Sequence, residues 1–414
     1  MAFNHYVLDN GLSLYVQPST KFKTVMLKVF WQQNLDEHAA KNALLASILK
    51  RGTSANPTST GLNRLMDELY GAEFDTGVTK KGEQQIQEFS LELVKDSLVG
   101  EPVLERGLEL LREILLEPFV ENQGFSANYL EQEKEQLTQI IEGIVNDKVQ
   151  YSIERCLQEL GKGERFGLPR YGKVTDFVEI TPENLYNHYL ERRQSVPIVM
   201  FVVGDVDPEK VYQSVNKIFS FSHSGNYQLL PVEVKSNPTK VKEIVERQEI
   251  NQGKLTLGYR TNACYKDDSY PALVVYNGVL GAFAHSKLFQ NVREKSSLAY
   301  YATSKLEKTK GILLIASGIE FSNYTQARKI IEEQVSQMAE GQITSLELDN
   351  TKKAIIHQLR SSTDNFHLTI DLALDGLVNG RHREIEELIR EIQAVSITDL
   401  IKVAEGIKLD TVYY

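Results

Sequence analysis

The side chains that most often do chemistry in proteins, those of histidine and cysteine, are few and widely spaced in this chain. Its 414 residues include eight histidines and two cysteines. The histidines are His5, His38, His188, His223, His285, His357, His367 and His382. No two of them lie three to five residues apart, the spacing that lets two imidazoles on one helix or in a zinc finger bind one metal ion. The sequence therefore contains no local metal-binding pair, and it leaves open a metal site built from distant residues.

The cysteines and the remaining local clusters offer equally little. Cys156 and Cys264 are far apart and outside any CxxC motif, so a disulfide framework or zinc knuckle is not expected and a reducing compartment fits. Both thiols are expected to be buried rather than reactive. The cluster Asp36-Glu37-His38 is explained better by a solvated helix N-terminus than by a metal site. The glycine-rich residues 161–172 follow no predicted strand and precede no Lys-Ser/Thr pair, so they make a poor phosphate loop.

One short stretch, residues 42–53 (NALLASILKRGT), is distinguished by what it lacks. If residues 41–49 form a helix, the leucines and Ile48 make its apolar face, and Ala43, Ala46 and Ser47 share another face at spacing i, i+3 and i+4. The stretch contains no His, Cys, Asp or Glu, so it offers no strong metal ligand.

Length and composition exclude several classes of protein. A chain of 414 residues is too long for one ordinary domain and suits two. With 42% apolar and 25% charged residues it is expected to be soluble and globular, and its net charge of −10 disfavours nucleic acid or an anionic membrane as partner. No apolar run approaches the roughly 18 residues of a membrane span, and no signal peptide is recognised, so a cytoplasmic location is expected.

Hydrophobic periodicity predicts alternating groups of strands and helices in the first half. Asn10-Gly11 is a strong hairpin signal and predicts that the chain opens with two paired strands. The predicted strands cover residues 5–8, 12–17, 24–31, 73–79, 85–93 and 197–203. The predicted helices cover residues 41–49, 63–70, 102–116, 127 to about 160, and 208–219.

The second half repeats this order, which predicts two homologous domains. Residues 221–238 are rich in Ser, Asn and Pro and lack a helical period, so they are expected to link a domain over 1–220 to one over 239–414. Strands are expected at 255–259, 300–306 and 312–319, with helices at 271–281, 285–294, 323–339 and 345–359. In both halves a strand pair is followed by one amphipathic helix and then a longer one.

Several motifs, spread over nearly the whole chain, together resemble a known family. The weaker ones are Asn10-Gly11-Leu12, LKRGT at 49–53, LLEP at 115–118, EKE at 133–135 and VGDVD at 203–207. The most specific are Gly281, SKLF at 286–289 and REKSSLAY at 293–300. This set resembles the pitrilysin or insulinase family, inverted-zincin peptidases that include insulin-degrading enzyme and the mitochondrial processing peptidase. The resemblance implies an α+β fold of two homologous domains, each a mostly antiparallel sheet covered by helices, as in LuxS/mitochondrial-processing-peptidase-like metallohydrolases.

The resemblance also implies that the zinc site of the family is degenerate here. In active members the zinc helix reads H-x-x-E-H and begins nine residues before the Gly of a Gly-Thr pair. Counted back from Gly52, the first ligand falls on Ala43, the general base on Ala46 and the second ligand on Ser47. Alanine can neither bind zinc nor accept a proton, and a neutral serine hydroxyl is a poor zinc ligand.

The third ligand of the family is a glutamate two helical turns after another glutamate. Counted from Glu133, this position falls on Ile140, whereas a frame shifted to Glu135 would place it on Glu142. The resemblance therefore implies that this chain binds no zinc by itself, since a single glutamate could not hold the metal.

Two residues of the family's second domain are retained. Active relatives have an Arg and a Tyr, seven residues apart, that close over the substrate, and these positions are Arg293 and Tyr300 here. Ser297 replaces the family's Gly, so the turn between them is expected to differ. Without the resemblance, Arg293 would be read as a surface ion-pair partner and Tyr300 as a core residue. The adjacent Tyr301 is expected on the opposite face of the strand.

The resemblance implies a role in a complex. Bacterial relatives can work as heterodimers in which one chain carries H-x-x-E-H and zinc and the other carries the Arg/Tyr pair, and this chain resembles the second type. The expected substrates are unfolded peptides bound by strand addition, with residues 85–93 as a candidate edge strand. The alternatives are a scaffold or peptide-binding protein without proteolytic role, for which the expected partner is a second copy of this chain, and an independent zinc peptidase with a displaced site.

Overall fold

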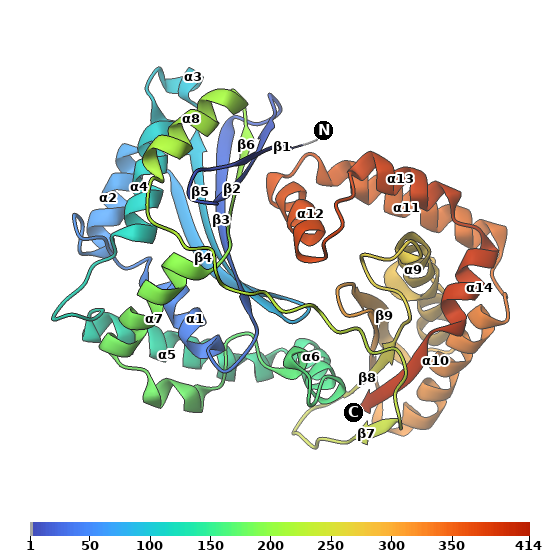
Figure 1. Cartoon of the computed structure of the whole chain (residues 1–414). Helices are drawn as coiled ribbons and strands as arrows, with labels where there is room; N and C mark the ends of the chain where they lie inside the picture. Colours follow the sequence, from blue (N-terminus) through green and yellow to red (C-terminus); the bar gives the residue numbers. More distant parts are fainter. Residues whose placement is uncertain (1–2) are drawn as a thin grey trace. The chain divides into compact units, whose positions relative to one another are not determined.

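The chain forms two compact units in the computed structural model, which describes residues 3–414. The first unit runs to Glu142 and resumes over Leu168–Leu230, and the second comprises Gly143–Gly167 and Pro231–Tyr414. Each unit is built on its own β-sheet (Figure 1). The sequence-based boundaries of 1–220 and 239–414 assign residues 143–167 to the first domain, whereas the structure places them in the second unit.

The first unit contains a six-stranded sheet in the order β1-β2-β6-β3-β5-β4. Its strands are β1 (Asn4–Val7), β2 (Ser13–Pro18), β3 (Thr24–Asn34), β4 (Glu73–Lys81), β5 (Gln84–Val94) and β6 (Ile198–Gly204). Strands β2 and β6 run parallel, and the other neighbours are antiparallel. The hairpin predicted from Asn10-Gly11 is confirmed, with Gly11 at a φ of 82° that an L-residue with a side chain adopts rarely.

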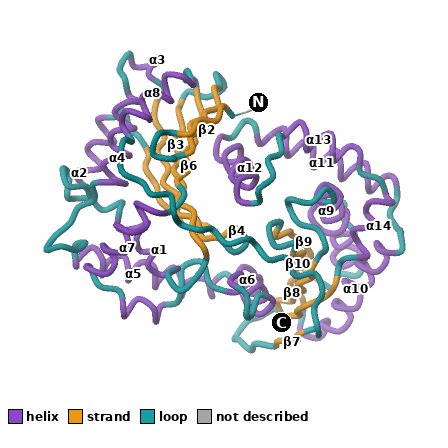
Figure 2. The backbone as a smooth tube through the Cα atoms, in the orientation of Figure 1, coloured by secondary structure: helices purple, strands orange, loops and turns teal. Residues whose placement is uncertain are grey.

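Helices of the first unit lie against its sheet, as the purple and orange segments of Figure 2 show. They are α1 (Ala39–Ile48), α2 (Ser59–Glu68), α3 (Asp96–Val99), α4 (Val103–Leu116), α5 (Ala127–Gly143), α7 (Pro182–Ser195) and α8 (Pro208–Ile218). Leu27, Val29 and Trp31 of β3 and Leu44 and Leu45 of α1 are fully buried in one core. Their burial fixes α1, the helix that carries Ala43, Ala46 and Ser47, against the sheet.

The prediction of one long helix from residue 127 to about 160 is wrong. Helix α5 ends at Gly143, the 3₁₀ turn η1 (Ile144–Asn146) follows, and α6 (Lys148–Leu160) begins after it. The Asp147 side chain accepts hydrogen bonds from the N–H groups of Val149 and Gln150, at 3.1 and 3.0 Å, and so starts a new helix. Cys156 of α6 is buried in a cluster with residues of the second sheet, which explains why α6 belongs to the second unit.

The second unit contains a five-stranded sheet in the order β7-β11-β8-β10-β9. Its strands are β7 (Lys242–Ile244), β8 (Gly253–Arg260), β9 (Ala299–Glu307), β10 (Ile312–Ile319) and β11 (Lys408–Tyr413). Its other helices are α9 (Tyr270–Asn277), α10 (Tyr324–Ala339), α11 (Ser345–Ser362), α12 (Phe366–Val378), α13 (Ile385–Ala394) and α14 (Ile397–Glu405). Strands β7 and β11 run parallel and the other neighbours antiparallel, so two mostly antiparallel sheets covered by helices confirm the predicted fold class.

The prediction that residues 85–93 form an edge strand is wrong. They belong to β5, which pairs with β3 on one side and with β4 on the other. The strand at this edge of the first sheet is β4, and the edges of the second sheet are β7 and β9. Along residues 3–414, none of the helices combines the length and the apolar character that crossing a membrane requires.

Candidate functional site

Helix α1 carries Ala43, Ala46 and Ser47, the residues that the resemblance aligns with the zinc ligands and general base of active peptidases. Ala43 and Ala46 are buried in the core of the first unit, and Ser47 is half-buried. The Ser47 hydroxyl donates a hydrogen bond of 3.4 Å to the carbonyl oxygen of Ala43, one turn earlier on its own helix. This face therefore presents packed methyl groups and an internally bonded hydroxyl.

A buried amide network holds α1 beside these positions. The Asn42 Nδ2 group donates to Gln85 Oε1 of β5 at 2.7 Å, and Asn42 Oδ1 lies 2.7 Å from His188 Nε2 of α7. Gln85 Nε2 donates to the carbonyl oxygen of Ala39, and Gln87 Nε2 donates to that of Asn42. Polar side chains from β5 and α7 thus fix α1 by buried hydrogen bonds.

His188 is a neutral member of this network. Burial, together with the nearby positive charge of Arg192, lowers its pKa to about 3. Neutral imidazole has one N–H, and the close approach of Nε2 to Asn42 Oδ1 places that proton on Nε2. His188 is thus a structural donor at neutral pH, and sequence reasoning gave no signal for it because its partner is 146 residues away.

Helix α5 carries Ile140, the residue that the resemblance aligns with the third zinc ligand. Its face formed by Leu130, Glu133 and Leu137 is buried, and Ile140 continues the same stripe but is 50% exposed. Glu133 forms an ion pair with Arg51, which lies three residues after the end of α1. The alternative position, Glu142, is exposed on the same helix.

The donor set of these two helices does not fit zinc. Over residues 3–414, no three His, Cys, Asp or Glu side chains come together in a way that could hold a metal ion. Near α1 the carboxylate of Glu133 already neutralises Arg51, and the imidazole of His188 is tied to Asn42. These residues therefore do not fit a catalytic zinc ion.

Arg293 lies on the surface of the second unit, in the π-helical turn η5 (Phe289–Lys295). Its guanidinium carbon stands 4.6 Å from the ring centroid of Phe289, and its Nε is 3.6 Å from Glu294 Oε1. The side chain is 44% exposed, so both contacts are open to water and can be exchanged for a ligand at small cost.

The turn after Arg293 keeps a left-handed backbone although it contains no glycine. Ser297 has a φ of 50°, and its N–H donates to the carbonyl oxygen of Arg293 at 3.1 Å. Ser297 thus adopts a backbone conformation that favours glycine, at a strain of about 1 kcal/mol. The serine therefore does not prevent a left-handed turn at this position.

Tyr300 is the extra residue of a β-bulge in the edge strand β9. Gly318 of β10 lies opposite Tyr301, whereas the next residue, Ile319, lies opposite Ala299. Tyr300 is 59% exposed, and its hydroxyl donates to Glu320 Oε1 at 3.0 Å. Bulges redirect side chains beside functional sites, so the interpretation of Tyr300 as a core residue does not hold.

Tyr301 has a different environment from its neighbour. Its ring packs over Gly318, where an added Cβ would come within 2.5 Å of the ring. Burial raises the pKa of the Tyr301 phenol to about 12. Tyr301 therefore has a packing role, and Tyr300 is the exposed phenol of the pair.

Known proteins resemble this chain in both sequence and fold. Residues 179–355 match the family model described as the peptidase M16 inactive domain. A probable inactive metalloprotease of Bacillus subtilis, YmfF, is 37% identical over 98% of this chain and 95% of its own length. An uncharacterized zinc protease of the same organism, YmxG, is 26% identical over 56% of each chain. A conserved protein from Enterococcus faecalis has a similar crystal structure, with a TM-score of 0.91, 30% identity, and coverage of 100% of this chain and 98% of its own.

Proposed function

This chain belongs to the peptidase M16 family, of which it is an inactive homologue, and from that premise we propose that it is the substrate-binding subunit of a two-chain peptidase. The partner in this proposal is a homologous chain that carries H-x-x-E-H and the zinc ion. The substrates are unfolded peptides. The proposal explains why one half of the family's machinery is replaced by packed side chains while the other half is retained.

The observation that carries the proposal is the position of Tyr300 on its bulge. A phenol that served only the core would be buried, whereas this one projects from an edge strand into solvent. Its O–H can donate a hydrogen bond to the oxyanion that develops on a peptide carbonyl, and Arg293 can bind a neighbouring carbonyl or carboxylate of the same substrate. Both side chains would exchange their present acidic neighbours, Glu320 and Glu294, for the substrate.

The first unit can contribute to peptide binding through β4. This strand pairs with β5 on one side only, so its other edge presents backbone N–H and C=O groups. An extended peptide can add to such an edge as a further strand. Strand β4 replaces residues 85–93 as the candidate edge, because these belong to β5, which is paired on both sides.

A reconstitution assay tests the proposal. Hydrolysis of an unfolded fluorogenic peptide is measured for this chain, for a homologous H-x-x-E-H chain from the same organism, and for their mixture, each with zinc. Activity that appears or rises only in the mixture is expected. Zinc-dependent hydrolysis by this chain alone, or no gain on mixing, would refute the proposal.

The alternative is a scaffold or peptide-binding protein, in a homodimer or another assembly, with no proteolytic role. One observation favours this alternative. Glu294 pairs with Arg293 and Glu320 accepts a hydrogen bond from Tyr300, so both side chains have partners without a substrate. Substituting Arg293→Ala in the active mixture separates the two functions, with Lys295→Ala as a matched control on the same turn. The proposal predicts a loss of activity for the first variant only, and the alternative predicts no gain on mixing at all.

A further inference from the structure

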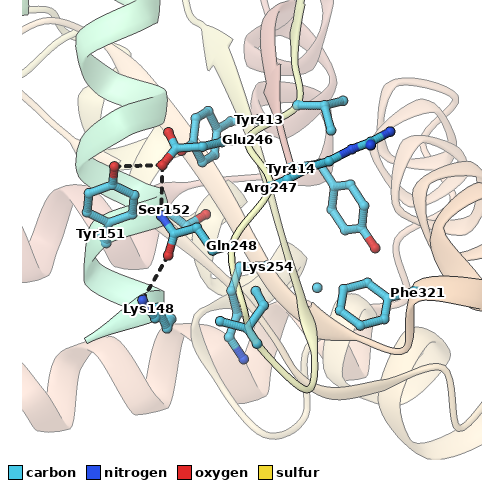
Figure 3. Close-up of a pocket in the computed structure, with 13 residues that line it drawn as sticks. Lys148, Tyr151, Ser152, Glu246, Arg247, Gln248, Lys254, Phe321, Tyr413 and Tyr414 are labelled. Carbon is cyan, nitrogen blue, oxygen red and sulfur yellow. Dashed lines mark hydrogen bonds between the residues drawn. The ribbon is translucent and has the colours of Figure 1, made fainter. Parts of the chain in front are cut away.

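The second unit contains a cavity of about 430 Å³ that no part of the proposed peptidase role uses. It lies where strands β8 and β11 meet the N-terminal turn of α6 and the segment 245–250 that follows the edge strand β7 (Figure 3). Its volume falls within the range of sites that hold small ligands or peptide side chains, about 300–1,000 Å³.

On one side of the cavity, the carboxylate of Glu246 is held by hydrogen bonds and an ion pair. Glu246 accepts hydrogen bonds from the hydroxyls of Tyr413 and Tyr151, at 2.6 and 2.8 Å, and from Gln248 Nε2 at 2.7 Å. Arg155 adds an ion pair at 3.5 Å. Burial opposes ionisation of Glu246, but these donors outweigh it and lower its pKa to about 2, so the carboxylate is charged and is paired with Arg155.

The other side of the cavity has unused binding groups. In Figure 3, Arg247, Tyr414 and Phe321 lie on the opposite side of segment 245–250 from Glu246 and Gln248. Arg247 is exposed and has no hydrogen-bond or ion-pair partner among residues 3–414. The Tyr414 hydroxyl is buried, and within the same residues it has no hydrogen-bond partner. Burial raises the pKa of this phenol, so it remains a donor.

Apolar groups lie beside these two polar ones. Phe321 is 53% exposed and Val245 is 65% exposed, although both line the cavity. The ring of Tyr414 lies over Gly253, where a Cβ would come within 2.4 Å of it, so this glycine makes room for the ring. An exposed phenylalanine and valine that line the same cavity as an unpaired guanidinium suit a ligand with an apolar body and an anionic group.

The adjoining edge strand favours a peptide as the source of such a ligand. The Glu246 N–H donates to the carbonyl oxygen of Tyr414, and the Tyr414 N–H donates to that of Ile244, so alternate residues of this segment pair with the C-terminal end of the chain. Val245 lies between Ile244 and Glu246, and Arg247 follows Glu246. The backbone N–H and C=O groups of Val245 and Arg247 therefore point away from the sheet. A peptide can use these groups by strand addition, whereas an alkyl chain cannot.

We propose that this cavity binds the C-terminal end of an extended peptide whose last side chain is apolar. The terminal carboxylate bonds to Arg247 and to the Tyr414 hydroxyl. The apolar side chain lies between Phe321 and Val245, and the peptide backbone pairs with segment 245–247. This site involves neither Arg293 nor Tyr300, so it does not depend on the proposed peptidase role.

The test is fluorescence anisotropy of the full chain with an N-terminally fluorescein-labelled peptide of five Gly and Ser residues ending in Leu-Phe. The free-acid peptide is expected to bind about tenfold or more tightly than the same peptide with a C-terminal amide. Arg247→Ala is expected to weaken binding of the acid about tenfold or more and to abolish its advantage over the amide. Tyr414→Phe, which keeps the ring, is expected to weaken it a few-fold.

Two control variants test whether the peptide binds at this cavity. Lys240→Ala removes an exposed positive charge outside the cavity, and Arg293→Ala alters the other candidate site, so both are expected to bind normally. Equal binding of acid and amide, or an Arg247→Ala variant that binds like the Lys240→Ala control, would overturn the proposal. Binding of dodecanoate by a chain that does not bind the peptide would assign the cavity to a fatty acid and overturn it as well.

Discussion

Removal of the Asn42 side chain should destabilise the first unit strongly, because this amide connects three elements. Asn42 is buried, and its side chain bonds to Gln85 of β5 and His188 of α7, each at 2.7 Å. In Asn42→Ala, Gln85 Oε1 and His188 Nε2 lose these partners inside the core. Each buried group left unsatisfied costs about 1–3 kcal/mol, so for two groups the loss in free energy of unfolding should be about 2–6 kcal/mol.

The chain provides its own reporter for this measurement. Its single tryptophan, Trp31, is fully buried in β3, so urea unfolding followed by tryptophan fluorescence reports on the first unit. Asn63→Ala on the exposed surface of α2 is the matched control and should change stability by no more than about 0.5 kcal/mol. A loss below about 1 kcal/mol for Asn42→Ala would refute the idea that this network holds α1 in place.

Three further predictions concern single residues. The pKa of His188 is about 3 in the folded chain and has an ordinary value of 6.5, so between these pH values the unfolded chain binds more protons than the folded one. The free energy of unfolding should therefore fall as the pH decreases through that window, by up to about 1.4 kcal/mol per pH unit. A His188→Gln variant should lose this contribution to the pH dependence of the free energy of unfolding. Ser297→Gly should relieve the left-handed strain and raise the melting temperature by about 1–3 °C in a thermal scan, whereas Ser297→Val should lower it. Ala43→His should overpack the core and cost about 1–3 kcal/mol in urea unfolding; an unchanged stability would mean that space for a ligand remains beside α1.

Local sequence signals predicted the elements that depend on neighbouring residues. Asn10-Gly11 predicted the opening hairpin, because a tight turn needs only its own two residues to set the backbone. The pattern of apolar residues likewise predicted a helix over 285–294 and a strand over 300–306, where the structure has the helical turn η5 and the strand β9. The division of residues 127–160 was missed because their helical periodicity continues across the break, and the Asp147 cap that makes it is a single residue in a charged stretch.

The rest of the site depends on residues that are distant in sequence. The pairing of Asn42 with Gln85 joins residues 43 positions apart, and that with His188 joins residues 146 apart. The bulge at Tyr300 is set by its register with β10, which the spacing of apolar residues in β9 cannot define. Sequence could therefore name Ala43, Ala46 and Ser47 as positions without zinc chemistry, but it could not show what holds their helix in place.

The contribution of Tyr300 to a partner's peptidase activity is the central claim, and the kcat/KM of the reconstituted mixture tests it most directly. Tyr300→Phe removes only the hydroxyl that would bond to the developing oxyanion, and Tyr301→Phe removes the neighbouring hydroxyl as a control. We predict that Tyr300→Phe lowers kcat/KM of the mixture by about 10²–10³-fold, mainly through kcat, and that Tyr301→Phe leaves it within a few-fold of the unmodified mixture. An unchanged kcat/KM with Tyr300→Phe would contradict the claim.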